Sequence, residues 1–122
     1  MREIKFRAWD GERLRKVNTI GWVDEGVDFV TTPRYSGPAE DFRLMQFTGL
    51  KDKNGVEIYE GDVLFHPLQG RRKVFYPYSE TVASYGLRDI DNGFGSTLQD
   101  SHAIWEVIGN IYENQELLER LR

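Results

Sequence analysis

The sequence contains no cysteine among its 122 residues. This absence excludes disulfides, thiolate zinc sites, iron–sulfur clusters and cysteine nucleophiles, and it fits a reducing compartment. There is no run of about 18 apolar residues that could cross a membrane as a helix. The charged N-terminal stretch MREIKFRAWD also lacks the continuous apolar core of a secretory signal. We therefore expect a cytoplasmic protein with no membrane partner.

Metal and cofactor motifs are missing as well. The two histidines, His66 and His102, are far apart and have no short-range ligand spacing. The acidic stretches that start at Asp52 and Asp89 do not match a calcium loop, because their glycines fall too early. No P-loop, G-x-G-x-x-G or G-x-S-x-G motif is present. We expect no metal and no cofactor.

One group of residues could in principle carry acid–base chemistry, namely Glu57, Glu60 and Asp62 with His66. Acids beside turns usually cap backbone N–H groups or face water, and this structural interpretation is the simpler one here. An enzyme would require these four side chains to converge in the fold. We expect a protein that is not an enzyme and has no catalytic residues.

Positive charge is in the minority, since the formal net charge is -4. A globally acidic chain is a poor candidate for nucleic-acid binding, which usually shows a basic field. Local basic sets exist nonetheless, in residues 1–16 and at 71–73, although solvated strand faces would explain both. The second set is followed by aromatic residues, which is the combination that single-strand binders use. Nucleic-acid binding by this hairpin is the alternative hypothesis, and its residues are Arg71, Arg72, Lys73, Phe75 and Tyr76.

What the sequence has in quantity is aromatic residues, at 13%, and glycine, with 12 residues. Together with many β-branched residues these favour a mainly β protein. The stretch FTGLKDKNGVEIYEGDVLFH, residues 47–66, places Gly49, Gly55 and Gly61 six residues apart, each near an expected change of chain direction. Short strands, tight turns and glycines at bends are typical of a small, sharply curled barrel.

The expected strands begin with a hairpin of 2–9 and 14–23 around Asp10-Gly11. A two-residue loop would place Phe6 opposite Arg15, and a four-residue loop would place it opposite Val17, which buries more apolar surface. A short strand at 27–31 precedes a loop, and the segment 77–101 has no clear conformation. The remaining strands are expected at 42–50, 56–59, 62–66, 72–76 and 102–112. We expect residues 1–41 to form an N-terminal hairpin section and 42–122 to form the barrel, packed together as one unit.

A short helix is expected over residues 115–122, with Asn114 as its N-cap. Glu116 can pair with Arg120 one turn later. Eight residues are too few for an isolated helix, so its apolar face must dock on the same chain or on another copy. This face is the candidate oligomer contact, and it consists of Leu117, Leu118 and Leu121.

Three stretches together carry a family resemblance: MREIKFRAWD at the start, MQFTGLKDKNGVEIYEGDVL at 45–64, and EVIGNIYENQELLE at 106–119. The sequence resembles the YopX family of phage and prophage proteins. The resemblance implies a β-rich protein with an SH3-like barrel and homo-oligomeric assembly. It implies no activity and no catalytic residues.

The leading hypothesis is therefore a non-catalytic, phage-encoded accessory protein that acts as an oligomeric interaction module, with a host or phage protein as a further partner. Barrels of this kind expose aromatic grooves. The aromatic candidates are Tyr59, Phe75, Tyr76, Tyr78 and Trp105, each of which could equally be a core residue. Within this set, Tyr59 joins the hairpin residues Arg71, Arg72, Lys73, Phe75 and Tyr76 as the candidate interaction surface.

Overall fold

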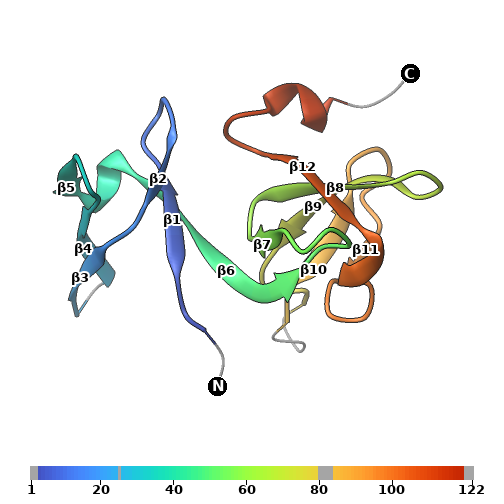
Figure 1. The fold of residues 1–122 in the computed structure, drawn as a ribbon, viewed down its shortest axis with the longest axis horizontal. Coiled ribbons are helices and arrows are strands. Elements are labelled where there is room, and N and C mark those ends of the chain that lie inside the picture. The colour runs from blue at the N-terminus through green and yellow to red at the C-terminus, as the bar shows by residue number, and fades with distance from the viewer. Residues whose placement is uncertain (1–2, 25, 80–83, 120–122) are drawn as a thin grey trace.

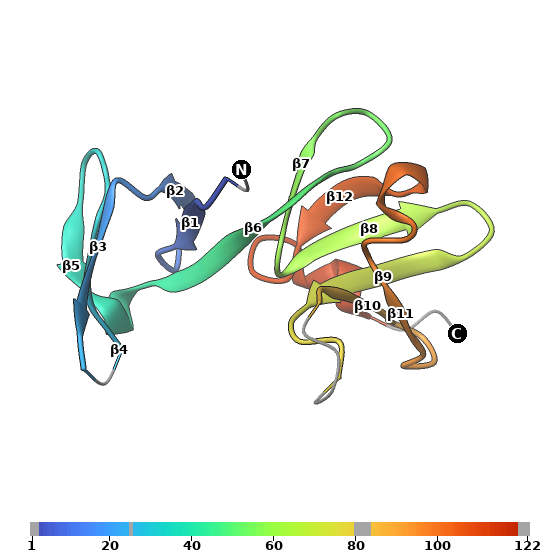
Figure 2. The same cartoon turned by 90° about the horizontal axis from the view of Figure 1, so that it is seen from below.

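The computed structural model describes residues 3–24, 26–79 and 84–119 of the chain. It is mainly β, as expected, with three antiparallel sheets arranged in two lobes (Figure 1). One long strand, β6 (Arg43–Lys51), runs from the N-terminal lobe into the C-terminal lobe, and both views show it as the bridge between them (Figure 2).

The first hairpin of the N-terminal lobe pairs β1 (Phe6–Trp9) with β2 (Leu14–Lys16). Trp9 lies opposite Leu14, which corresponds to the four-residue loop and confirms the register that buries more apolar surface. The Asp10 carboxylate closes this loop by accepting hydrogen bonds from the backbone N–H groups of Glu12 (2.8 Å) and Arg13 (2.9 Å). A side-chain pair with Arg15, followed by these two bonds, holds the pKa of Asp10 well below its usual range.

The predicted strand over 14–23 is wrong as a single strand, because it is divided between two sheets. After β2 the chain leaves the first sheet and forms β3 (Thr19–Val23), which pairs with β4 (Gly26–Thr31). The predicted loop beyond residue 31 contains a third strand, β5 (Ser36–Pro38), and a 3-10 turn, η1 (Ala39–Asp41). The division lets Val30 pack against Ala8 and Phe42, which form the buried core of this lobe.

The C-terminal lobe is a five-stranded sheet in the order β11-β10-β9-β8-β12. Its core is larger than that of the N-terminal lobe and is built around Trp105, which is fully buried. The other core residues are Ile58, Leu64, Val74, Tyr85, Leu87 and Leu98. Its strands are β8 (Asp62–His66), β9 (Gly70–Phe75), β10 (Gly86–Asp89), β11 (Gly95–Thr97) and β12 (Glu106–Asn110), with the 3-10 turn η2 (His102–Ile104) before the last.

Over the part of the chain that the structure describes, none of the three sheets closes into a barrel, so the SH3-like barrel remains a prediction. The far end of β6 pairs with β7 (Glu57–Tyr59), and the turns on either side of β7 meet the C-terminal lobe through single backbone bonds. One of these joins Lys53 N–H to the Trp105 carbonyl at 2.9 Å, and another joins Gly61 N–H to the Val74 carbonyl at 2.9 Å. Gly49, Gly55 and Gly61 all have positive φ. Gly55 and Gly61 lie in turns, as expected, whereas Gly49 lies within β6, where the pairing with β7 shifts register.

The C-terminal segment forms a single 3-10 turn, η3 (Gln115–Leu118), where an α-helix over 115–122 was expected. The backbone of Glu119 is already extended (φ -73°, ψ 133°), and residues 120–122, including Arg120, lie outside the described part of the chain. Asn114 precedes the turn but makes no capping bond. Its side-chain oxygen instead accepts the N–H of Asn110 at 3.2 Å, so the expected N-cap is wrong. No helix among the described residues is long and apolar enough to span a bilayer.

Candidate interaction surfaces

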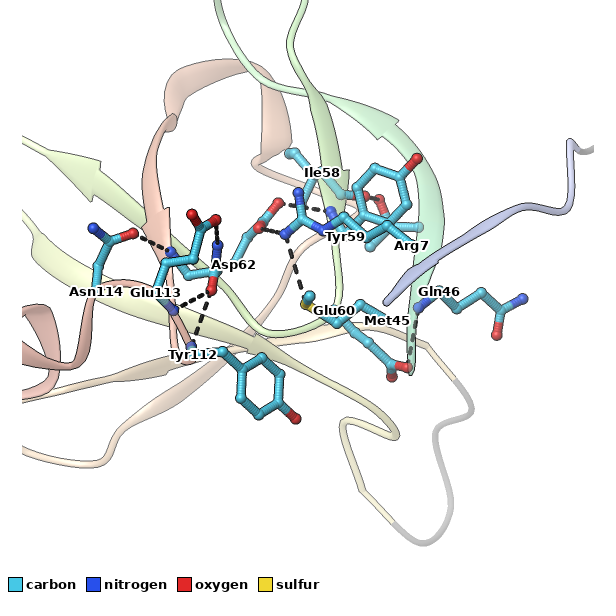
Figure 3. A network of polar contacts seen from close by, with 12 residues as sticks. Arg7, Met45, Gln46, Ile58, Tyr59, Glu60, Asp62, Tyr112, Glu113 and Asn114 are labelled. Carbon is cyan, nitrogen blue, oxygen red and sulfur yellow. Dashed lines mark hydrogen bonds and ion pairs between the residues drawn. The ribbon is translucent and has the colours of Figure 1, made fainter. Parts of the chain in front are cut away.

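The two lobes are connected by an ion pair between Arg7 on β1 and Asp62 at the start of β8 (Figure 3). Asp62 is only 1% exposed and also accepts the backbone N–H of Tyr59 at 2.8 Å. The guanidinium of Arg7 lies over the Tyr59 ring, 4.4 Å from its centroid. Burial disfavours the charged carboxylate, and despite the nearby arginine it raises the pKa of Asp62 to about 6.

The other members of the candidate acid–base set have separate structural partners. Glu57 forms an ion pair with Lys5. The Glu60 carboxylate accepts the backbone N–H of Gln46 at 3.2 Å and points away from the Asp62 carboxylate (Figure 3). The Nδ1 atom of His66 accepts the Leu68 N–H at 3.1 Å. These contacts agree with the interpretation of the acids as turn and strand partners, and the absence of enzymatic activity stays a prediction.

A polar residue that sequence reasoning treated only as part of a turn, Asp52, is buried and connects distant segments. One carboxylate oxygen accepts the N–H groups of Asn54 (2.8 Å) and Val56 (2.9 Å), and the other accepts that of Val107 on β12 (2.9 Å). Burial by itself would raise the pKa of Asp52, but the three hydrogen bonds outweigh it and lower the pKa below its ordinary value. Asp52 therefore holds the turn after β6 against the C-terminal lobe.

The basic hairpin is divided between the two faces of β9. Arg72 points to the core side, where it donates to Ser96 Oγ at 2.7 Å and lies over the Trp105 ring, 5.2 Å from its centroid. Its Nε atom also faces the Asp89 carboxylate at 3.8 Å. Because successive strand residues point to opposite faces, Arg71 and Lys73 lie on the other side. The three cations therefore do not form one surface, and Arg72 is a structural residue.

Of the aromatic members of the candidate interaction surface, Phe75 shares the face of Lys73 on β9, whereas Tyr59 and Tyr76 lie elsewhere. Tyr59 lies beneath Arg7 and borders a cleft of about 370 Å³. Tyr76 is half-exposed, packs at 5.1 Å against the Tyr85 ring, and borders a separate cleft of about 450 Å³. The sequence already contained a signal that separates Arg72 from Arg71 and Lys73. Side chains alternate between the two faces of a strand, so Arg72 shares its face with the apolar residue Val74, which is buried.

The candidate oligomer contact is only partly described. Leu117 and Leu118 are half-buried, whereas Leu121 lies outside the described residues. A Cβ atom added to Gly109 would lie 2.8 Å from the Leu117 side chain, so this leucine packs over β12 of its own chain. The side chain of Arg71 donates to the Glu119 carbonyl and supports the same docking.

The N-terminal lobe exposes more large apolar side chains than its small core buries. Trp22 is 65% exposed and Val23 is 53% exposed, both at the end of β3. Phe29 on β4 and Tyr35 before β5 are also exposed. The strand β3 pairs only with β4, so its other edge is free among the described strands.

These motifs and this arrangement of strands are those of a known family, since the model of the YopX protein family matches residues 5–119. The chain belongs to the YopX family. A similar solved structure, protein EF1440 from Enterococcus faecalis, is 28% identical, with a TM-score of 0.70 over 98% of this chain and all of that one. Protein yopX from Bacillus subtilis is 21% identical, with a TM-score of 0.58 over the full length of both chains, and shows the shared fold. Among curated proteins, none matches this chain.

Proposed function

We propose that this YopX-family chain is a non-catalytic, phage-encoded accessory protein of the host cytoplasm that works as an oligomeric interaction module. Its first partner is a second copy of itself, joined through β3. The observation that supports this proposal is the unprotected edge of β3, whose sequence TIGWV has neither a charged residue nor proline.

Free strand edges attract other strands, and soluble proteins usually protect them with charge, proline or short length. The other edge strands among the described residues follow this rule. β2, β7 and β12 carry charged residues, β5 ends in Pro38, and β11 has three residues. β3 is five residues long and ends in the exposed Trp22 and Val23. Pairing of two β3 strands about a two-fold axis would satisfy both free edges and cover these side chains.

The face of the same sheet that points away from the core supports contact between copies. Phe29 lies opposite Gly21 on one side and Pro38 on the other, and its ring covers the glycine. The flanking positions on this face are Thr19, Thr31 and Ser36. None of these six residues is charged, and the nearest charge on β4 is the exposed Asp28 at the bulge, so electrostatic repulsion between two copies of the face is limited.

The test is the mass of the purified protein in solution, measured by light scattering after size exclusion across a range of concentrations. We expect a species larger than the 14.2 kDa chain, and we expect Trp22→Lys to shift it to the monomer, because a lysine protects the edge. Phe94→Lys is the matched control, since Phe94 is a 73% exposed aromatic residue in the other lobe. A wild-type protein that stays monomeric, or a Trp22→Lys variant that assembles like wild type, would refute the proposal.

A further partner is expected among host or phage proteins. An affinity pull-down from lysate of the phage-carrying host, with nuclease treatment, would supply it. A protein that is retained by wild type and by Phe94→Lys but lost from Trp22→Lys uses the same edge as the second copy.

A further inference from the structure

The face of β9 and β10 that points away from the core brings together cations that are distant in the sequence. Lys73 on β9 lies directly opposite Arg88 on β10. Phe75 shares the face of Lys73, and Arg71 lies two residues before it on the same face. We call this surface the outer face and define it by Arg71, Lys73, Phe75, Tyr78 and Arg88.

Two aromatic rings pack on the outer face, where glycines leave room for them. A Cβ atom on Gly86, the cross-strand partner of Phe75, would lie 2.7 Å from the Phe75 ring and 3.1 Å from the Tyr78 ring. A Cβ atom on Gly95 would lie 3.4 Å from the Tyr78 ring. The rings therefore cover backbone that carries no side chains, and together they form an aromatic patch on the outer face.

The cations of the outer face lack acidic partners among the described residues. The ion pairs among the described residues use the cations Lys5, Arg7, Arg15 and Arg72, none of which lies on the outer face. Within the described ranges Lys73 has no side-chain partner, and Arg88 contacts the Phe75 ring, with 4.7 Å between its guanidinium and the ring centroid. Like charges directly opposite in a sheet are destabilising. An anion bound between Lys73 and Arg88 would remove this repulsion.

We propose that the outer face binds a single-stranded nucleic acid. Lys73 and Arg88 contact phosphates, and unpaired bases stack on Phe75 and Tyr78. Arg71 keeps its bond to the Glu119 carbonyl and adds positive charge at the hairpin end of β9. Basic side chains combined with rings on a sheet face are how single strands are bound without sequence preference. A duplex does not fit this surface, because its bases are already stacked and offer no free faces to the rings.

The net charge of -4 for the whole chain does not prevent this binding. At 0.15 M salt the screening length is about 8 Å, so phosphates in contact with the outer face experience mainly the local charges. The acidic total does predict modest affinity and strong dependence on salt.

The experiment is fluorescence anisotropy with labelled 20-nucleotide dT and rU strands and a 20-base-pair DNA duplex, each titrated at several salt concentrations. We expect both single strands to bind at low salt and the duplex to bind more weakly. The two single-stranded arms separate DNA from RNA as the preferred ligand.

The test variant is Lys73→Glu with Arg88→Glu. Loss of two phosphate contacts lowers the slope of log affinity against log salt by about 1.4, at about 0.7 for each phosphate. The matched control is Arg34→Glu with Lys53→Glu, which makes the same change in net charge at two exposed positions outside the outer face. We expect the control to retain the wild-type slope.

A second variant, Tyr78→Leu, removes a ring but keeps an apolar side chain. We expect a loss of about 5- to 150-fold in affinity, the range for one base–ring stack, with the salt slope unchanged. Thermal unfolding of each variant checks that it is folded. The proposal is overturned if no strand binds at low salt, if Lys73→Glu with Arg88→Glu binds like its control, or if the duplex binds as tightly as the single strands.

Discussion

The buried carboxylate of Asp52 allows two substitutions that remove different numbers of hydrogen bonds. In Asp52→Asn the side-chain oxygen still accepts the N–H groups of Asn54 and Val56, as Oδ1 does at 2.8 and 2.9 Å. The new NH₂ group then faces the N–H of Val107, where two donors meet and no bond forms. In Asp52→Ala all three bonds are lost.

The expected magnitudes follow from these counts. A hydrogen bond to a charged group contributes about 1.5–3 kcal/mol, so Asp52→Asn should lower the free energy of unfolding by about that amount. In Asp52→Ala the N–H groups of Asn54 and Val56 regain water, because both residues are exposed, whereas that of half-buried Val107 stays poorly solvated. We expect a total loss of about 3–5 kcal/mol for the alanine variant.

The assay is urea unfolding at pH 7, followed by tryptophan fluorescence, with the slope against urea checked for each variant. Repeating it at lower pH adds an independent test. Because the pKa of Asp52 is lowered in the folded state, its contribution is present above its ordinary pKa of 3.8 and is lost as the pH falls through the folded value. Equal losses below about 0.5 kcal/mol for both variants would refute the assignment of Asp52 as the link between the turn and β12.

Three further predictions concern buried groups. Asp62→Asn should flatten the change in unfolding free energy between about pH 4 and 6. Because the pKa of Asp62 is raised to about 6 in the folded state, its contribution to stability is complete below pH 3.8 and is lost as the pH rises through 6. An unchanged pH profile would contradict this prediction. Arg7→Met should raise the pKa of Asp62 further, since the nearest cation is removed, and a carboxyl NMR titration would measure it. Trp105→Ala should cost about 3–5 kcal/mol in urea unfolding, because this fully buried ring fills the core, and a loss under about 1 kcal/mol would disagree.

The features that the sequence predicted correctly are local. The mainly β class, the register of the first hairpin and the turns at Gly55 and Gly61 depend on alternation and on backbone preferences within a few residues. The family was also evident from three stretches of sequence, and the family match over residues 5–119 confirms it.

Only the tertiary structure determined the features that depend on contacts between segments distant in the sequence. The contacts between Arg7 and Asp62, and between Asp52 and Val107, join residues more than 50 positions apart and leave no local pattern. The strand expected over 14–23 is divided because Val30 packs on Ala8. The helix expected over 115–122 is replaced by a single 3-10 turn, because the conformation of so short a segment depends on the surface against which it packs. Likewise, Lys73 meets Arg88 only through strand pairing, while Arg72 faces the core because Val74 on its side of β9 packs there. Sequence alternation separates the two faces of a strand, but only the packed sheet determines which face is buried and which cations become neighbours.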